Sequence, residues 1–288
     1  MFLAVGHNGV RITSKDGQTW NKPILGKEGE VYRAAAYGNG HFAVVGTYGG
    51  ENIMASTADG AAWETGKRDA KYAHYFRGIT FADGFFLATG GDPGSVGAAK
   101  PFVAVSKDGA TWEDNFQIDG KFILRRLAFG NGVWVGVGDR GRIAASPDGK
   151  TWKDTEGTKP IDTMVDVTFG NGVFVGVGLN GLRRTSKDGA AWSDPIRGNE
   201  GEHLNSILFT GRQFVAVGAG ATYFSTDARD WKRMPNNNAP TFATFGAGIC
   251  VGTSWRGRLL RSLDGIDWKD VHKCEQPIEA VAFGATVQ

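Results

Sequence analysis

The heptapeptide SPDGKTW (Ser146–Trp152) is one of seven related strings that are spread over the whole chain. In each string an Asp follows a hydroxyl residue by two positions, and a Trp follows that Asp by four. The other copies are SKDGQTW (14–20), TADGAAW (57–63), SKDGATW (106–112), SKDGAAW (186–192), STDARDW (225–231) and SLDGIDW (262–268). Successive Trp residues are 43, 49, 40, 40, 39 and 37 positions apart. A period near 40 residues is typical of propeller blades and of helical-pair repeats.

A second string recurs in phase with the first and decides between these two architectures. It reads AYGNGHFAVVG (36–46), AFGNGVWVGVG (128–138) and TFGNGVFVGVG (168–178), with looser copies around Phe81, Phe209 and Phe245. Short apolar, β-branched runs that are broken by Gly-Asn-Gly or Asp-Gly predict strands joined by tight hairpin turns. No window has a sustained helical period or about 18 consecutive apolar residues, which excludes a helical solenoid and a membrane-spanning helix.

The two ends of the chain each carry half of the second string. IEAVAFGAT (278–286) matches its first half, and MFLAVG (1–6) matches its second half. Pairing of these two segments closes a ring and removes exposed sheet edges. The sequence therefore predicts an all-β fold, a seven-bladed β-propeller of four-stranded antiparallel blades, in which residues 1–288 form a single domain.

Each residue type in the first string has a structural task in such a blade. The Asp can accept hydrogen bonds from the N–H groups of its own turn, the Gly supplies a positive φ, and the Trp packs between blades. A motif that occurs once per blade indicates architecture, because a catalytic centre does not come in seven equal copies. The sixth copy has Ala228 in place of Gly, which predicts a distorted turn or one of another type.

The strings resemble the Asp-box, or BNR-type, repeat of sialidase-like propellers and of the seven-bladed photosystem II assembly and stability factors. In that family the box lies in a peripheral turn, away from the ligand site. The family's box has a residue between the Asp and the Gly, whereas Asp148 and Gly149 are adjacent. This shorter turn, and a count of seven blades where the sialidases have six, argue against a transfer of sialidase activity.

Candidate binding residues emerge when the first strands of the blades are aligned on their aromatic residue. Four positions before that residue the seven blades carry Arg33, Arg77, Arg125, Val165, Asn205, Thr241 and Glu279. Three successive blades thus offer Arg at one position, where an arc of guanidinium groups could bind a carboxylate or sulfate. The resemblance supports this interpretation, since sialidases hold the substrate carboxylate with three arginines, and YFRGI (75–79) is similar to their Phe-Arg-Ile-Pro motif without the Pro. Alternatively, each Arg stacks on a neighbouring blade or pairs with an acid such as Asp166 or Glu279.

The loops at the Arg end of the blades supply further candidates, because recognition usually resides in loops on a rigid scaffold. These loops include segments 47–52, 90–101, 139–142 and 254–258 and the crossing 70–77. Arg140 and Arg256 are candidate ligand-binding residues, and Tyr48 and Trp255 could either stack on sugar rings or cover the rim.

Charge and composition narrow the classes of partner. The net charge is +2, from 32 basic and 30 acidic residues, which gives no electrostatic case for a nucleic acid or a membrane. The five His residues lack metal-ligand spacing, and the Gly-rich strings do not precede a helix, so we expect neither a metal nor another cofactor. Cys250 takes the place of Trp134 and Phe174 in equivalent strands and is expected to be a small core residue.

The favoured function is a non-enzymatic, monomeric binding propeller for a protein segment or a glycan, possibly an anionic one. The alternative is a sialidase-like glycoside hydrolase, which needs two carboxylates about 5–10 Å apart. Its candidates near the Arg arc are Asp166, Glu279 and Asp139. The start MFLAVGHNG is not a signal peptide, and the resemblance implies an extracellular or periplasmic bacterial protein.

Overall fold

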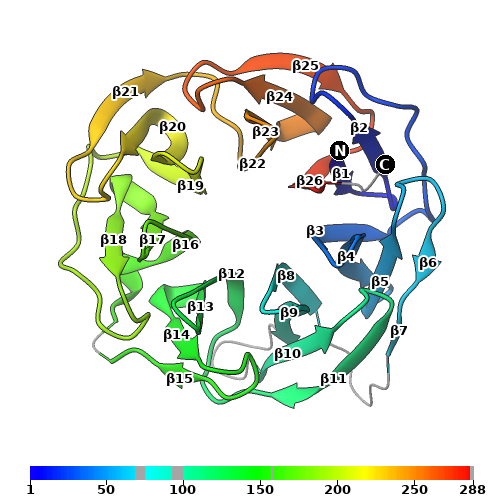
Figure 1. Ribbon diagram of the computed structural model, residues 1–288, viewed down its shortest axis with the longest axis horizontal. Coiled ribbons are helices and arrows are strands. Elements are labelled where there is room, and N and C mark those ends of the chain that lie inside the picture. The colour runs from blue at the N-terminus through cyan, green and yellow to red at the C-terminus, as the bar shows by residue number, and fades with distance from the viewer. Residues whose placement is uncertain (69–74, 93–99, 157, 286–288) are drawn as a thin grey trace.

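The computed structural model describes residues 1–68, 75–92, 100–156 and 158–285. These residues form seven β-sheets arranged as blades around a central axis (Figure 1). The predicted all-β, seven-bladed propeller is therefore confirmed. The second strand string provides the two inner strands of each blade, and the Asp-Gly strings form turns farther from the axis.

Within each blade the strands follow one another outward from the axis. Blade 1 holds β3 (Val31–Gly38), β4 (His41–Tyr48), β5 (Glu51–Thr57) and β6 (Glu64–Thr65). Blade 2 holds β8 (Tyr75–Ala82), β9 (Phe85–Asp92), β10 (Lys100–Ser106), β11 (Thr111–Gln117) and, parallel to β11, β7 (Lys67–Arg68). Blade 3 holds β12 (Leu124–Gly130), β13 (Val133–Gly138), β14 (Ile143–Ser146) and β15 (Lys153–Asp154).

The remaining blades follow the same order. Blade 4 holds β16 (Met164–Gly170), β17 (Val173–Gly178) and β18 (Arg183–Ser186), and blade 5 holds β19 (His203–Phe209), β20 (Phe214–Ser225) and β21 (Lys232–Asn236). Blade 6 holds β22 (Phe242–Gly246), β23 (Ile249–Ser254), β24 (Arg258–Ser262) and β25 (Lys269–Lys273), and blade 7 holds β26 (Ile278–Phe283), β1 (Phe2–Gly6) and β2 (Arg11–Ser14). The 3-10 turns are η1 (Asp139–Gly141), η2 (Pro160–Asp162), η3 (Leu179–Gly181) and η4 (Trp255–Gly257). Across the described ranges, no helix is long and apolar enough to cross a membrane.

The prediction of four strands in every blade is wrong, because the sheets contain three to five strands. In blade 5 the single strand β20 pairs with β19 through its first half and with β21 through its second half. In blades 4 and 7 the outermost described segments make only isolated bridges, such as Arg183 with Ile196 and Arg11 with Ile24. An outermost strand has a neighbour on one side only and buries little surface, so short and irregular pairing there costs the fold little.

The predicted closure of the ring is confirmed. Strand β1 pairs antiparallel with β26, and Phe2 lies opposite Phe283. The amino group of Met1 also donates a hydrogen bond of 2.7 Å to the carbonyl oxygen of Gly284. Both chain ends thus belong to blade 7 (Figure 1).

The repeated Asp-Gly turns use their polar atoms internally, as the turn of blade 3 shows. Asp148 Oδ1 accepts hydrogen bonds from the backbone N–H groups of Lys150 and Thr151 at 2.8 and 2.7 Å and from Ser146 Oγ at 3.0 Å. The equivalent Asp accepts the same two backbone bonds in all seven copies. Gly149 has a φ of +73°, and a Cβ on it would lie 3.1 Å from Leu87 of blade 2. The turn is therefore both a local structure and a contact between blades.

The expectation of an altered turn at Ala228 is wrong. Ala228 keeps the left-handed φ of 62°, and Asp227 Oδ1 still accepts the N–H groups of Arg229 and Asp230, both at 2.9 Å. An Ala in this conformation costs about 1 kcal/mol. Its methyl group is buried in the core between blades 4 and 5, which offsets part of that cost.

The hydrophobic core consists of clusters that each join two adjacent blades. Trp152, for example, packs with Leu87 and Val103 of the preceding blade, and its Nε1 donates to the carbonyl of Gly149 at 2.8 Å. The aromatic residue of each inner strand makes a second contact of this kind: a Cβ on Gly130 would lie 2.2 Å from the ring of Phe169. The predicted packing of Trp between blades is confirmed. The Phe and Gly of the second string also make a contact that joins neighbouring blades.

Candidate functional site

The aligned positions of the Arg arc coincide with a β-bulge at one end of the inner strands. The pairing register skips Arg33, Arg77, Arg125, Val165, Asn205 and Glu279, each of which lies between two regularly paired residues. In blade 6, Thr241 immediately precedes β22, and its N–H and Oγ1 donate to the carbonyl of Thr253 at 2.7 and 2.9 Å. A bulge takes its residue out of the regular alternation of the strand. Six of the seven blades thus present the same bulge with different side chains, at the end of the ring that we call the loop end.

The bulge position carries a charged side chain in four consecutive blades, 7, 1, 2 and 3. Arg33 Nη1 lies 3.4 Å from Glu279 Oε2, and Glu279 Oε1 lies 2.7 Å from His7 Nε2. Arg125 makes a two-point ion pair with Asp139, in which Nη2 lies 3.1 Å from Oδ2. We call this set the charged arc: His7, Glu279, Arg33, Arg77, Arg125 and Asp139.

Arg77 lies at the centre of the charged arc and differs from its two Arg neighbours. No described residue forms an ion pair or hydrogen bond with its guanidinium group, and its Nε is buried without a partner. Burial lowers the pKa of Arg77, as do the nearby charges of Arg33 and Arg125, while Asp139 and Glu279 oppose this shift. The side chain is partly exposed. Among the described residues, Arg77 is therefore a cation without an acidic partner.

The alternative interpretation of the arginines is correct for two of them. Arg33 and Arg125 pair with acidic residues, as that interpretation expects, although Asp166 is not one of these residues. Asp166 is buried, and its Oδ2 accepts hydrogen bonds from Ser206 Oγ at 3.0 Å and from the N–H of Ile207 at 2.9 Å. Burial raises the pKa of Asp166, and the charge of Arg126 opposes that shift. Asp166 thus fastens blade 4 to blade 5.

The three carboxylates proposed for catalysis lie on three different blades and have separate partners. Glu279 and Asp139 belong to blades 7 and 3, with blades 1 and 2 between them, and each has its own cationic partner. No hydrogen bond joins any two of Asp166, Glu279 and Asp139, all of which are described. Each of the three carboxylates thus makes a contact within the protein.

Sequence reasoning missed Arg126, which lies inside the ring. A cavity of about 160 Å³ between the inner strands is lined by Arg126 and Asp166 among others. The guanidinium carbon of Arg126 lies 4.7 Å from the ring centre of Phe242 on blade 6. The Arg-Arg pair at 125–126 was a usable signal, because the other two arginines of the arc are followed by Ala34 and Gly78.

The other rim candidates lie on the turns between the second and third strands. Arg140 and Arg256 are the central residues of η1 and η4, with φ values of 53° and 60°. Arg140 lies over the ring of Phe122 at 5.5 Å, and the amino group of Lys27 lies 5.6 Å from the ring centre of Tyr48. Arg140 and Tyr48 therefore each have a partner within the protein.

The first residue of these turns divides the loop end into two halves. Blades 7 and 3 place His7 and Asp139 there, whereas blades 4 and 6 place Leu179 and Trp255, which are 45% and 79% exposed. We call the second set the neutral half: Val165, Leu179, Asn205, Thr241 and Trp255. Two of the segments predicted for this end, the loop 90–101 and the crossing 70–77, lie partly outside the described residues, at 93–99 and 70–74.

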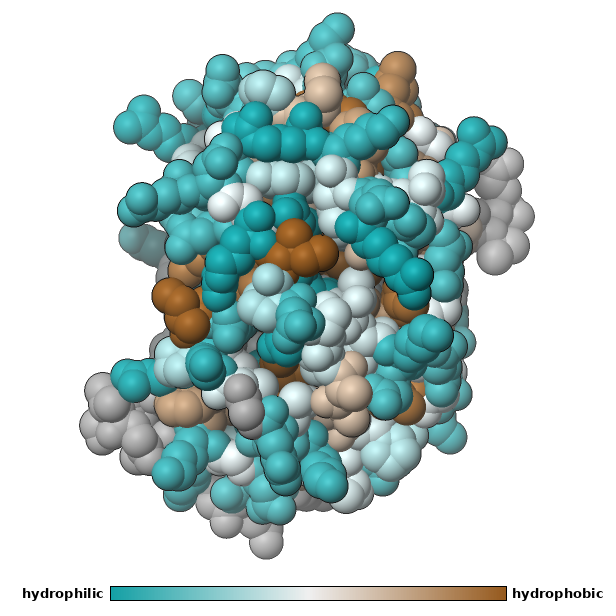
Figure 2. Space-filling view, turned by 90° about the vertical axis from the view of Figure 1, so that its left-hand side faces the viewer, coloured by the Kyte–Doolittle hydropathy of each residue, from teal (hydrophilic) through white to brown (hydrophobic). Residues whose placement is uncertain are grey.

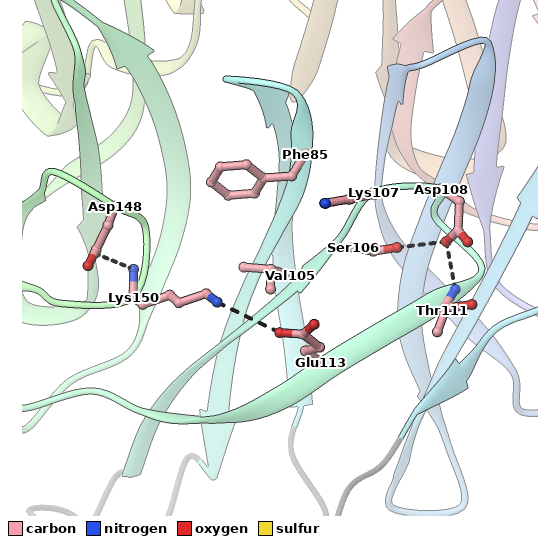
Figure 3. Close-up of a pocket in the computed structure, with 9 residues that line it drawn as sticks. All are labelled: Phe85, Val105, Ser106, Lys107, Asp108, Thr111, Glu113, Asp148 and Lys150. Carbon is pink, nitrogen blue, oxygen red and sulfur yellow. Dashed lines mark hydrogen bonds and ion pairs between the residues drawn. The ribbon is translucent and has the colours of Figure 1, made fainter.

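The larger cavities lie at the opposite end, which we call the turn end. One of about 670 Å³ lies between the turns of blades 2 and 3 (Figure 3). Many of its polar groups already have partners: Ser106 Oγ donates to Asp108 Oδ1 at 3.0 Å, and Lys150 Nζ lies 3.7 Å from Glu113. A similar groove of about 350 Å³ lies between the turns of blades 4 and 5. These grooves recur with the blades, so we attribute them to the architecture.

The outer side of the ring carries no large hydrophobic patch on the face that Figure 2 shows. Around β18 and β21 it is mainly hydrophilic, with small separate hydrophobic spots (Figure 2). In the part of the chain that the structure describes, no group of three or more His, Cys, Asp or Glu residues could hold a metal ion. The charged arc and the neutral half thus remain the candidate site.

Comparison with known proteins identifies the fold. The chain is similar to the solved structure of YCF48 bound to D1 peptide, with a TM-score of 0.65 and 18% identity over 91% of this chain and 87% of that one. It is also similar to YCF48 from Cyanidioschyzon merolae (TM-score 0.58, 16% identity, 84% and 85% covered) and to a chain of a nidogen–laminin complex (TM-score 0.57, 14% identity, 99% and 98% covered). The sequence matches no protein-family model and no curated protein. Identities this low bear on the fold alone, and they agree with the seven-bladed propeller.

Proposed function

We propose that this protein is a non-enzymatic binding propeller that holds an anionic segment of another protein at the charged arc. The observation that carries this proposal is Arg77, a partly buried guanidinium group that lies between two like charges and has no acidic partner among the described residues. A carboxylate placed there gains charge-assisted hydrogen bonds, and its charge offsets the repulsion between the three arginines.

The other contacts of the charged arc favour a positioned ligand. Glu279 and Asp139 hold Arg33 and Arg125 in place on either side of Arg77. A guanidinium group that is already positioned loses less side-chain entropy when it binds a carboxylate. We also propose that the repeated turns are Asp-boxes that take no part in binding, since their Asp oxygens already accept internal hydrogen bonds.

The choice of a protein segment over a glycan rests partly on a neighbour of the same fold. One of the similar solved structures is YCF48 bound to D1 peptide, which makes a peptide a reasonable first ligand to test. A glycan remains the second ligand class, with Trp255 and Tyr48 as its stacking residues. We do not favour the sialidase-like hydrolase, because Asp166, Glu279 and Asp139 are each engaged with other groups.

Binding of an acidic peptide to variants at the charged arc tests the proposal. The probe is a fluorescein-labelled peptide of four Glu residues spaced by Gly and Ser, and the readout is fluorescence anisotropy. We expect Arg77→Ala to weaken binding by about 1.5–3 kcal/mol, the range for a hydrogen bond to a charged group. Arg77→Lys should restore part of the affinity, because an ammonium group cannot form a two-point contact. Added salt should weaken binding of the wild type.

The matched control is Arg212→Ala, which removes an exposed Arg from a turn at the other end of the ring. It should leave affinity unchanged. If Arg77→Ala lowered the thermal stability and spared the affinity, Arg77 would be a structural residue and the proposal would fail. Turnover of a fluorogenic sialoside that disappeared in Asp166→Asn or Glu279→Gln would instead establish the hydrolase.

A further inference from the structure

In the neutral half of the loop end, two large apolar side chains, Trp255 and Leu179, are exposed to solvent. Trp255 is 79% exposed, and no described residue makes a ring contact, hydrogen bond or ion pair with its side chain. Leu179 is 45% exposed at the same turn position two blades away. Large apolar side chains are enriched at the centres of protein interfaces, and a Trp exposed to this degree is a candidate for such a contact.

The backbone of both turns is fixed against neighbouring segments. In η4 a Cβ on Gly257 would lie 2.4 Å from the carbonyl oxygen of Cys274, whose own N–H donates to Gly257 at 2.9 Å. In η3 the N–H of Gly198 donates to the carbonyl of Asn180 at 2.9 Å. Trp255 and Leu179 are therefore held out by anchored turns, which lowers the entropy lost when a partner covers them.

Blade 5 lies between these two side chains. At the position where blades 4 and 6 have a 3-10 turn, blade 5 has only a bend in a continuous strand. Strand β20 passes from its inner to its outer half without a 3-10 turn, and Ala219 and Gly220 lie exposed at that bend. No large side chain of this bend stands between Leu179 and Trp255. Apolar side chains of a partner could thus reach Trp255 and Leu179 without meeting a large side chain from this bend.

The charged arc and the neutral half lie on opposite sides of the ring. In a ring of seven blades, blade 2 with Arg77 faces blades 5 and 6 across the axis, as the places of β8, β19 and β23 show (Figure 1). An extended peptide advances about 3.3 Å per residue, so a segment of several residues is needed to reach from one side to the other.

We infer that the partner is an extended amphipathic peptide segment that crosses the loop end, with a carboxylate on Arg77 and an apolar side chain on Trp255, in the half that also exposes Leu179. This inference rests on the proposed function and specifies its ligand. Leu179 favours a peptide over a glycan, because an aliphatic side chain gives a sugar ring no aromatic face on which to stack.

Selection from a displayed library of random twelve-residue peptides tests the inference on the full-length protein. We expect the enriched sequences to combine an acidic residue with a Leu, Ile, Phe or Trp at a fixed separation. A synthetic copy of the best sequence is then measured by fluorescence anisotropy beside two altered copies, one with Ser for the apolar residue and one with Gln for the acidic residue.

Protein variants then assign each half of the peptide to its side of the ring. Trp255→Ala should weaken the binding of the parent peptide about tenfold and leave the Ser copy unaffected. Arg77→Ala should weaken the parent peptide and leave the Gln copy unaffected. Leu263→Ser, which removes a 70% exposed Leu from the turn end, is the matched control and should change neither affinity.

Failure of this inference differs from failure of the proposed function. If only acidic residues are enriched and Trp255→Ala has no effect, the proposed function stands and the amphipathic segment is wrong. If Trp255→Ala weakens binding and Arg77→Ala does not, the charged arc does not bind an anionic ligand, and the proposed function fails together with the inference. Binding of a sialylated oligosaccharide that depends on Trp255, or no enriched peptide at all, would overturn the peptide assignment.

Discussion

The two ends of the ring are built from the same number of blades and differ in how much those blades resemble one another. At the turn end each blade repeats one Asp-centred turn, and each Asp accepts the same two backbone hydrogen bonds. At the loop end the inner strands repeat a bulge whose residue changes from Arg to Val, Asn or Glu. The uniform end thus holds the blades together, whereas the varied end carries side chains that this contact between blades does not fix.

The physical reason for this division is that neighbouring blades must meet in the same way at every junction. Gly149 packs on Leu87 of the blade before it, and Gly189 packs on Val135 of its own preceding blade. In repeat proteins each unit contacts mainly its neighbours, so one solution serves every junction. A side chain at the loop end has no such requirement, and its identity can follow the partner.

Acid should produce the largest effect, because it acts on all the turns of the turn end together. Backbone N–H groups of Thr19 and Gln18 lower the pKa of Asp16 from 3.8 to about 2, and those of Arg229 and Asp230 lower the pKa of Asp227 to about 2. A carboxyl group whose pKa falls on folding stabilises the fold above pH 4, and this stabilisation is lost as the pH falls to 2.

The measurement is the thermal unfolding midpoint followed by circular dichroism from pH 7 to pH 2. The midpoint should fall steeply below about pH 4, and the fall should be smaller in Asp16→Asn. A midpoint that stayed constant down to the acid end of this range would show that the turns do not contribute as the geometry indicates.

Gly130→Ala should have the next largest effect, since it forces a methyl group into the ring of Phe169 in the next blade. We expect a loss of about 1–3 kcal/mol in the free energy of unfolding, the usual range for overpacking. Gly132→Ala is the control, because Gly132 has a φ of +75° and open space around it. That variant should lose only about 1 kcal/mol, from the backbone conformation. Equal losses in urea unfolding would argue against the close contact between blades.

Asp148→Ala should have a smaller effect that is confined to stability. The loss of the turn hydrogen bonds should lower the free energy of unfolding by about 0.5–2 kcal/mol. Affinity for the acidic peptide should not change, because this turn lies at the end away from the charged arc. Asp230→Ala removes an exposed carboxylate that accepts none of these turn bonds and keeps the backbone N–H that donates to Asp227, so it should be neutral. A folded Asp148→Ala protein that no longer bound the peptide would contradict the division between the two ends.

Asp139→Asn should have the smallest effect, and it should strengthen the binding of the acidic peptide instead of weakening it. The substitution keeps the shape of the side chain and releases Arg125 from its ion pair, so the charged arc becomes more positive. We expect affinity for the acidic peptide to rise about two- to fivefold, in line with the worth of a partly exposed charge pair, and stability to fall by less than about 1 kcal/mol. Reduced affinity would mean that Asp139 orients Arg125 for the ligand.

Much of the fold was predictable because its signals are local and repeated. The Asp-Gly turns, the inner strands and the closure between residues 1–6 and 278–286 all follow from strings that recur along the chain. The strand count was less predictable, because β20 and the outermost segments of blades 4 and 7 depend on weak pairing far from the axis. The turn at Ala228 was predicted wrongly, because its neighbours in the core were not visible in the sequence.

The candidate site was predictable only in part. Alignment of the repeats placed Arg33, Arg77 and Arg125 at one position, and the bulge confirms that placement. The alignment does not reveal that two of these arginines are paired and one is not. The alignment also does not indicate that Asp166 joins two blades, or that Arg126 extends over Phe242 inside the ring.

The sequence by itself determined the seven-bladed ring, because periodic turn and strand signals within about 40 residues specify each blade and the same signals specify the next. The tertiary structure alone decided which cation is free. Arg33 meets Glu279 from the far end of the chain, Arg125 meets Asp139 in the turn after the neighbouring strand of its own blade, and Arg77 meets no acid among the described residues. These pairings depend on distances between side chains that the closed ring brings together, and such distances leave no trace in a local pattern of residues.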